Sequence, residues 1–448
     1  MKALPIFAAV LLVAAPALGA VAPASVANPP VTNQSVQPAA DADAPITAAT
    51  NGPLGSFTPR VLSIPRDQSS RSVVSRQSVD LGQAVDFGVN ATSMRLETES
   101  TVERISSVER SDQRQRLLLG ELNRIEQQVI TLNGDQRSAI EAYGDGRISP
   151  RTLLVRLASV SARASALEDR RQRLGQLAER TEGFSYSSQR VESLRRELDT
   201  LTGPVRTYAI STIRGDVPPG RFYVETGPES VVLSTITEDA YVREAYRGDL
   251  RNQDENRISP QDAVNATARG YPEIWQRKTD YTVLGAGDNY LVRVPYDTGI
   301  LSAFVDSGSG EVFKEFQRRS LNRSIVNQTQ SKTQNGLRLA VSRSYPGSPL
   351  YVNLTDADTG EPVEANVTIG PAENDSTLIG RTDAAGELWT VTPDYRFTIF
   401  AIRGNSFVFV TVDPTDPPRT GPANDGGRAV DDNRTTALIP DASLSRRG

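Results

Sequence analysis

The sequence contains no histidine and no cysteine, and only four of its 49 basic residues are lysines, so arginine carries nearly all of the positive charge. The missing histidine excludes Ser-His-Asp triads, HExxH zinc sites and any imidazole that titrates near neutral pH. The missing cysteine excludes thiolate nucleophiles, thiolate zinc sites, iron–sulfur clusters and disulfides. Most enzyme chemistry is thereby removed, and we expect a protein that is not an enzyme.

Apolar and aromatic residues are also scarce, at 38% and 6% of the 448 residues. A chain of this length predicts two or three domains, and the low apolar content predicts that part of it is linker or exposed helix. The net charge is only −5, and residues 93–203 contain 18 arginines against 17 acidic residues. This balance gives no basic surface for nucleic acid, so we expect no nucleic-acid partner.

The chain starts with Met1 and Lys2, followed by an uncharged apolar run from Ala3 to about Ala22. The charge, the apolar length and the small residues near position 20 predict a secretory signal peptide over residues 1–20. An uncleaved membrane anchor is the alternative, because the run is nearly long enough to span a bilayer. Its prolines favour cleavage, and we expect an exported protein, extracellular or at the cell surface, with membrane contact only if the run is uncleaved.

Nine Asn-x-Ser/Thr sequons fit an exported chain, because such sites predict exposed, glycosylated surface. They begin at Asn33, Asn90, Asn265, Asn322, Asn327, Asn353, Asn366, Asn374 and Asn433. The sequence does not indicate which of them are used.

Two segments are too poor in large apolar side chains to fold by themselves. Residues 21–92 predict a disordered linker and a docking segment. The residues expected to dock onto the next domain are Val61, Leu62, Ile64, Val73, Val74 and Val85. Residues 414–448 predict a disordered tail.

Residues 93–203 have helical periodicity. One seam of alternating four- and three-residue steps comprises Leu153, Leu157, Val160, Ala164, Leu167, Arg171, Leu174 and Ala178, and another runs from Leu118 to Ala139 with earlier apolar positions at Val102 and Ile105. The turn 143–150 separates them, with Ser149 as a cap and Pro150 at the first helical position. We expect an antiparallel coiled-coil hairpin of two long helices and a short third one, which binds a protein partner or a second copy through its seam.

Residues 204–320 read as strands interrupted by one helix that begins at Ser259 and Pro260. The helix residues Ala263 and Ala266 and the closing run from Phe304 to Val312, with Asp306, Gly310 and Glu311, resemble PepSY-type domains over about residues 258–317. That resemblance implies a small α+β binding or inhibitory module. Residues 204–257 are either the rest of the sheet or a degenerate second copy.

Residues 336–413 predict a β-sandwich from alternating apolar runs and turns. The turn from Asp356 through Thr359, Gly360 and Pro362 to Val363, followed by Ala365, Val367, Thr382, Asp383 and Gly386, resembles carboxypeptidase-regulatory-like or transthyretin-like domains. The resemblance implies an immunoglobulin- or transthyretin-like fold used for surface spacing or binding. The whole chain is therefore predicted to be α+β and multidomain.

A calcium site is predicted in this domain, formed by Asp356, Asp358, Glu361 and Asp383, because carboxylate-rich loops suit hard cations. Plain turn formation by these aspartates is the alternative. No other cofactor is expected. Paired carboxylates could instead serve a hydrolase, but a sugar cleft also needs aromatic platforms and the two tryptophans lie far apart in the sequence.

The preference for arginine over lysine, the acidic pI and the absence of cysteine resemble exported proteins of haloarchaea. The leading hypothesis is a non-enzymatic cell-envelope protein that acts in protein–protein interaction or surface structure. The alternative is a regulator or inhibitor of an exported peptidase, acting through the PepSY-like region.

Overall fold

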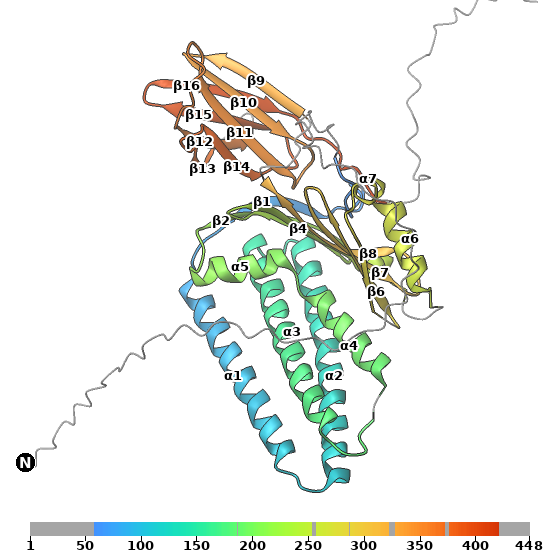
Figure 1. The fold of residues 1–448 in the computed structure, drawn as a ribbon. Coiled ribbons are helices and arrows are strands. Elements are labelled where there is room, and N and C mark those ends of the chain that lie inside the picture. Colours follow the sequence, from blue (N-terminus) through green and yellow to red (C-terminus); the bar gives the residue numbers. More distant parts are fainter. Residues whose placement is uncertain are drawn as a thin grey trace, which may run out of the picture. The chain divides into compact units, whose positions relative to one another are not determined.

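The computed structural model of the chain describes residues 58–185, 187–252, 257–285, 287–321, 328–371 and 376–420. All of them belong to one compact unit, Gly55–Gly448. The predicted signal peptide, residues 21–57 and 421–448, and the sequons at Asn33, Asn322, Asn327, Asn374 and Asn433 lie outside the described residues. The described chain combines helices with three antiparallel sheets (Figure 1), which confirms the predicted α+β class.

The largest sheet has eight antiparallel strands in the order β1-β2-β3-β4-β8-β7-β6-β5. Their bounds are β1 (Arg71–Gln77), β2 (Gly220–Gly227), β3 (Ser230–Ile236), β4 (Ala240–Arg247), β5 (Thr282–Leu284), β6 (Asn289–Tyr296), β7 (Gly299–Asp306) and β8 (Val312–Ser320). Because β4 pairs with β8, strands β2, β3 and β4 supply the rest of one sheet and do not form a second, separate module. Strand β1 lies inside the predicted linker and docking segment, and it contains Val73 and Val74, which were expected to dock and which pair with strand β2.

Both faces of this sheet are covered, and this explains why β4 was not predicted from its sequence. All eight residues of β4, AYVREAYR, are buried. Val242 and Tyr246 pack in one core, whereas Ala245 packs in the core on the opposite face. A strand that is buried on both faces loses the alternation of polar and apolar residues that marks a half-exposed strand.

Five helices form the layer on one face: α1 (Leu81–Ser106), α2 (Ser111–Gly144), α3 (Pro150–Glu179), α4 (Ser188–Leu201) and α5 (Pro204–Arg214). Helices α2 and α3 are the two long helices predicted around the turn, and Ser149 caps α3 by accepting from the Thr152 N–H at 3.1 Å. The layer begins earlier and ends later than residues 93–203. Asp80 caps α1 by accepting from the Gln83 N–H, and Gly215, with φ +82°, ends α5.

Helix α1 is separate from α2, so the expectation that the helix carrying Leu118 begins earlier, at Val102 and Ile105, is wrong. The chain leaves the helix at residues 107–110 before α2 begins at Ser111. Ile105 nevertheless packs in the same core as Leu118 and Leu122, because α1 lies against the other two helices.

The seam of α3 is buried inside this helical layer. Its apolar residues pack against α2, α4 and α5: Leu153, Leu157, Val160, Ala164, Leu167, Leu174 and Ala178. The apolar residues of the seam are therefore packed within the chain, and binding of a partner or a second copy through the seam stays a prediction. The polar interruption is also displaced by one residue, because Arg170 is 2% exposed while Arg171 lies at the edge.

The other face of the sheet is covered by α6 (Pro260–Gly270), α7 (Pro272–Gln276) and the N-terminal segment, residues 58–70. A short 3₁₀ helix, η1 (Gly248–Leu250), follows strand β4. Leu62 and Ile64 pack in the core beneath α6 and α7, as predicted for a docking segment. Leu62 N–H also donates to Glu315 Oε2 at 2.8 Å.

The C-terminal domain is a β-sandwich, as predicted, with sheet orders β14-β11-β10-β9 and β13-β12-β15-β16. The bounds are β9 (Gln328–Gln334), β10 (Leu337–Arg343), β11 (Pro349–Asp356), β12 (Asn366–Pro371), β13 (Thr377–Arg381), β14 (Glu387–Val391), β15 (Phe397–Arg403) and β16 (Ser406–Val412). The domain begins before the predicted residue 336, because it includes strand β9, which starts at Gln328 and forms the edge of one sheet. Its sequence QTQSKTQ is exposed almost throughout and carries no apolar signal.

Two features attach the sandwich to the large sheet. The carbonyl of Gly347 accepts from Ser234 Oγ at 2.6 Å and from Tyr241 Oη at 2.8 Å. The first described residues of the predicted tail are ordered as well, since Thr420 N–H donates to Val61 O and Thr415 Oγ1 donates to Ser344 O. The expectation of disorder from residue 414 is therefore wrong up to residue 420.

Candidate interaction groove

The four residues of the predicted calcium site act in turns. Asp356 Oδ1 accepts from the N–H groups of Asp358 and Thr359, each at 3.0 Å, and these bonds lower the pKa of Asp356. Asp383 Oδ1 closes its own turn, accepting from Ala385 N–H at 2.9 Å and Glu387 N–H at 2.8 Å. In the part of the chain that the structure describes, no group of three or more carboxylates is gathered so that it could hold a metal ion. The geometry thus gives these aspartates the turn-forming role of the alternative.

The described sequons lie on several elements. Asn90 is exposed on α1, Asn265 is exposed on α6, and Asn366 is exposed on β12, whereas Asn353 is half-buried on β11. Asn90 also lines the groove described next.

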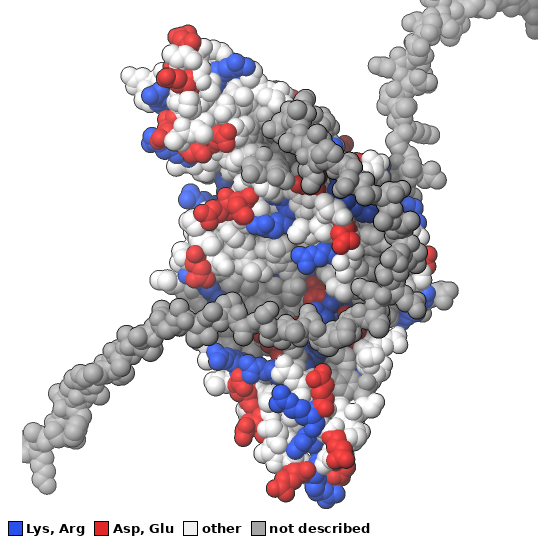
Figure 2. Space-filling view, in the orientation of Figure 1, with Lys and Arg blue, Asp and Glu red and all other residues white. Residues whose placement is uncertain are grey.

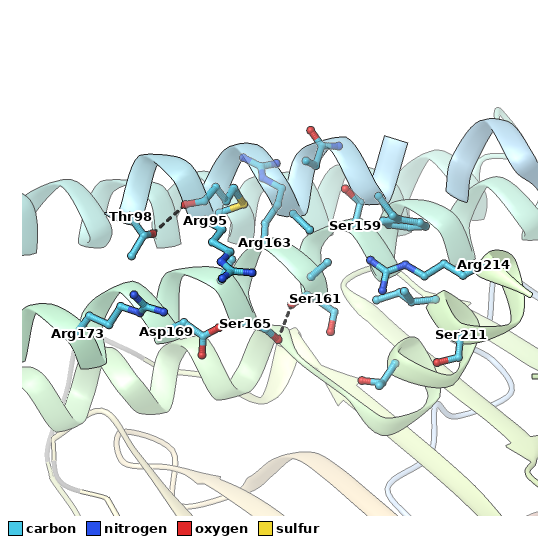
Figure 3. A pocket seen from close by; sticks show the side chains of 18 residues that line it. Arg95, Thr98, Ser159, Ser161, Arg163, Ser165, Asp169, Arg173, Ser211 and Arg214 are labelled. Atoms are coloured by element: carbon cyan, nitrogen blue, oxygen red, sulfur yellow. Dashed lines mark hydrogen bonds between the residues drawn. The ribbon is translucent and has the colours of Figure 1, made fainter. Parts of the chain in front are cut away.

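A groove of about 560 Å³ lies between α1, α3 and α5. Helix α3 supplies its longest wall, from Ser159 to Arg173, and α1 and α5 supply the two others. Figure 3 shows labelled side chains from all three helices around this space. The volume falls within the range of ligand-binding pockets in proteins.

Small and apolar residues form much of the surface of the groove. The members are Phe87, Ala91, Met94, Ala162, Ala166 and Ile210. The alanines keep the helices from filling the space between them, and the larger side chains give an apolar contact surface. The hydroxyl groups are partly used locally, since Thr98 Oγ1 donates to Met94 O and Ser165 Oγ donates to Ser161 O.

The charge on the groove is predominantly positive. Four arginines line it, Arg95, Arg163, Arg173 and Arg214, with Asp169 as the acidic residue among the 18 lining residues. Arg163 pairs with Asp135 at 2.9 Å, and Arg173 pairs with Glu99. Among the described residues, Arg95 and Arg214 have no ion-pair partner and both are exposed. Two guanidinium groups are therefore available to an anionic ligand.

This local excess differs from the rest of the helical layer. Figure 2 shows positive and negative side chains interspersed over the helical part of the face it displays, in agreement with the balanced composition of residues 93–203. The sequence could not reveal the groove, because its arginines come from helices 81–106, 150–179 and 204–214 and meet only after folding. Helix α5, which was not predicted from the sequence, contributes Arg214 to the groove.

A second exposed surface lies on α1 itself. Leu81, Val85, Val89 and Leu96 are 77%, 63%, 58% and 64% exposed. Their spacing places them on one side of the helix, away from the groove-lining residues of α1. Exposed apolar residues that gather on one surface are typical of interaction sites.

The fold defines a multidomain α+β protein whose last domain is a β-sandwich. Within residues 58–420, apart from the gaps stated above, no helix combines the length and the apolar character needed to cross a membrane.

Three family models match consecutive parts of the chain. A domain of unknown function (DUF7096) matches residues 1–217, a family of unknown function (DUF7094) matches residues 222–324, and an archaeal fibronectin-III type-like domain matches residues 328–410. No curated protein and no solved structure matches the chain. The C-terminal sandwich is thus similar to an archaeal fibronectin-III type-like domain, an immunoglobulin-like fold, in place of the transthyretin-like family expected.

Proposed function

We propose that this is a non-enzymatic, exported cell-envelope protein that acts by binding another protein, and that the groove between α1, α3 and α5 takes an acidic, partly apolar segment of that partner. The observation that carries the proposal is the excess of arginine in the groove, with Arg95 and Arg214 lacking an ion-pair partner among the described residues. Guanidinium groups bind carboxylates in bidentate geometry, which suits an acidic peptide.

The apolar part of the groove supplies the rest of the affinity. An ion pair at an exposed site contributes only about 0.2–1 kcal/mol, so two such pairs alone would give weak binding. Phe87, Met94 and Ile210 offer apolar surface beside them. A segment that places Asp or Glu one helical turn from Leu or Val satisfies both features.

Export is supported by the sequence of residues 1–20 and by the fibronectin-III-like domain, a type common in extracellular proteins. The arginine preference and the acidic pI support a haloarchaeal source. Packing of α2 against α3 in coiled-coil fashion remains part of the proposal, supported by the alternating four- and three-residue spacing of their buried residues.

The test is a charge-matched pair of variants in native envelopes. Arg95→Ser with Arg214→Ser removes the two available groove charges, and Arg269→Ser with Arg338→Ser removes two exposed charges elsewhere. Cross-linked proteins are recovered with each variant and identified by mass spectrometry. We expect a partner that the wild type and the control capture and the groove variant loses. Equal recovery by all three proteins would refute the groove as the binding surface.

A second candidate function is regulation of an exported peptidase through the PepSY-like region. It is supported by the capping box of α6, in which Ser259 and Asp262 bond each other's backbone N–H, and by the following strands β5 to β8. Because β1 and the helical layer complete this region, the full chain must be used in the assay. Slowing of a secreted protease by the full chain would support this function, and no slowing across several proteases would count against it.

A further inference from the structure

We propose that the exposed apolar side of helix α1 joins two copies of this chain, with the two α1 helices packed against each other in antiparallel orientation. This α1 face consists of Leu81, Val85, Val89 and Leu96, whose side chains are between 58% and 77% exposed. The proposal does not depend on the groove or on the proposed function.

Helix α1 has two apolar faces, and the fold of the chain uses only one of them. The buried residues, from Phe87 to Ile105, pack against the rest of the helical layer. At about 100° per residue, the α1 face is centred about 180° from these buried residues. Figure 1 shows α1 at the outer side of the helical layer, so its second face is directed away from the other helices. Packing within the described chain therefore does not account for this face.

The α1 face has the form of a helix-packing surface. Val85, Val89, Thr92 and Leu96 follow one another in steps of four, three and four residues, the spacing of a seam between two helices. The hydroxyl of Thr92 donates to Gly88 O at 2.9 Å, so its proton is used within the helix. Gly88 lies in the middle of the face, and a Cβ there would meet no atom of the described chain within 4 Å. Nothing nearby requires a glycine, but a glycine permits close approach of a second backbone.

The charges along α1 favour a second copy as the partner and an antiparallel orientation. The face carries no charged residue between Leu81 and Leu96, so two identical faces meet without opposing like charges. Beyond Leu96 the same side of the helix continues with Glu99 and Glu103, both exposed. A parallel pair would place each glutamate against its own copy, which is destabilising. An antiparallel pair instead places Leu81 beside Leu96 of the second copy.

The antiparallel pair also brings groups of opposite charge together at its two ends. Glu99, which pairs with Arg173 of its own chain, comes to the N-terminus of the other α1. That end of a helix carries partial positive charge, and the first turn of α1 contains no acidic residue. The carboxylate of its cap, Asp80, is already paired with Arg151 at 2.6 Å. The ends of the two helices are therefore complementary in charge.

The first experiment measures the mass of the full chain by analytical ultracentrifugation at loading concentrations from about 1 μM to about 500 μM. Val89→Ser removes an apolar side chain near the middle of the face. Ile130→Ser is the matched control on α2, because Ile130 is 61% exposed and Val89 is 58% exposed. Circular dichroism verifies that both variants are folded. We expect a reversible monomer–dimer equilibrium, weakened at least about tenfold by Val89→Ser and unchanged by Ile130→Ser, because each dimer loses two buried valines.

The second experiment tests the orientation and makes use of the absence of cysteine from the sequence. Leu81→Cys and Leu96→Cys are prepared as two separate proteins, mixed and oxidised. We expect the mixed disulfide between positions 81 and 96 to form faster than a disulfide between two identical positions. Preferential formation of 81–81 and 96–96 disulfides would overturn the antiparallel arrangement.

Other outcomes would assign the α1 face differently. A chain that stays monomeric over the whole concentration range would overturn the proposal, and so would equal association constants of the wild type and Val89→Ser. A monomeric chain that floats with phosphatidylglycerol vesicles, and loses this binding in Val89→Ser, would assign the face to a membrane surface and overturn the proposal as well.

Discussion

Replacing Glu244 by leucine tests the buried ion pair that joins the helical layer to the large sheet. Arg206 on α5 and Glu244 on β4 meet at 2.7 Å between Nε and Oε1, and their side chains are 1% and 3% exposed. Arg206 Nη1 also donates to Gln136 Oε1 at 2.7 Å, and Glu244 Oε2 accepts from the Val205 N–H at 3.2 Å. The ion pair is therefore buried away from water, and both of its side chains make further hydrogen bonds.

The expected loss in free energy of unfolding for Glu244→Leu is about 3–5 kcal/mol, because the Arg206 charge stays buried without its counter-ion. The loss is large compared with the roughly 5–15 kcal/mol that usually separates folded from unfolded proteins. Replacing both residues by leucine removes both charges, so the double variant should be much closer to the wild type than Glu244→Leu is.

The assay is urea unfolding of the full chain at constant ionic strength, followed by circular dichroism at the wavelength where helices dominate. Urea is preferred to guanidinium because it does not screen charges. A cost below about 1 kcal/mol for Glu244→Leu would refute the reasoning. So would a double variant that is as unstable as the single one, because then the uncompensated charge would not be the cause.

Three further substitutions follow from the same structure. Gly347→Ala should lower the free energy of unfolding by more than about 2 kcal/mol, because Gly347 has φ +75° and the added Cβ would lie 2.6 Å from the Tyr223 ring. The control, Gly336→Ala, has the same φ and open space around it, so it should cost only about 1 kcal/mol. Equal costs of the two substitutions in thermal unfolding would contradict this prediction. Arg170→Leu should cost about 1.5–3 kcal/mol, because the buried Glu121 loses its charged hydrogen bond to Arg170 at 2.6 Å while it keeps its pairs with Arg104 and Arg124. Arg171→Leu should cost less than about 1 kcal/mol, and the reverse order in urea unfolding would restore Arg171 as the polar layer. Burial and the charge of Arg206 lower the pKa of Lys314 well below its ordinary value of 10.5, so the unfolded chain binds more protons below that pH. The stability of the wild type should therefore rise as the pH approaches 10.5; Lys314→Met should lack this rise, and parallel pH profiles would count against it.

Helical periodicity and turn chemistry were the informative parts of the sequence. The apolar spacing around the turn predicted α2 and α3, and Ser149 with Pro150 predicted where α3 begins. The alternation of the C-terminal domain likewise predicted a sandwich. These features depend on local residue order, which a sequence displays directly.

The features that could not be predicted from the sequence depend on which other parts of the chain pack against each helix or strand. Strand β4 has no alternation because both of its faces are buried, and β9 has no apolar residues because it is an exposed edge. Spacing alone did not distinguish Arg170 from Arg171 as the buried residue, because adjacent positions on a helix differ only in the direction of their side chains.

The candidate sites were beyond prediction for a related reason. The groove needs Arg95, Arg163 and Arg214, which come from three different helices. Conversely, the carboxylates that did stand out as a local motif, Asp356 and Asp383, are occupied by their own turns. Local clustering in the sequence indicated turns, and the sites arise from long-range packing.

The most direct test of the proposed function is photo-crosslinking from the groove itself. A photoreactive amino acid at Ala166, on the α3 wall of the groove, is compared with one at Asn265, exposed on α6, in protein expressed in its native envelope. We predict a crosslink to an acidic segment of another exported protein from position 166 and not from position 265, lost when Arg95 and Arg214 are replaced by serine. Crosslinks of equal yield from both positions, or a crosslink from position 166 that persists without the two arginines, would contradict the proposal.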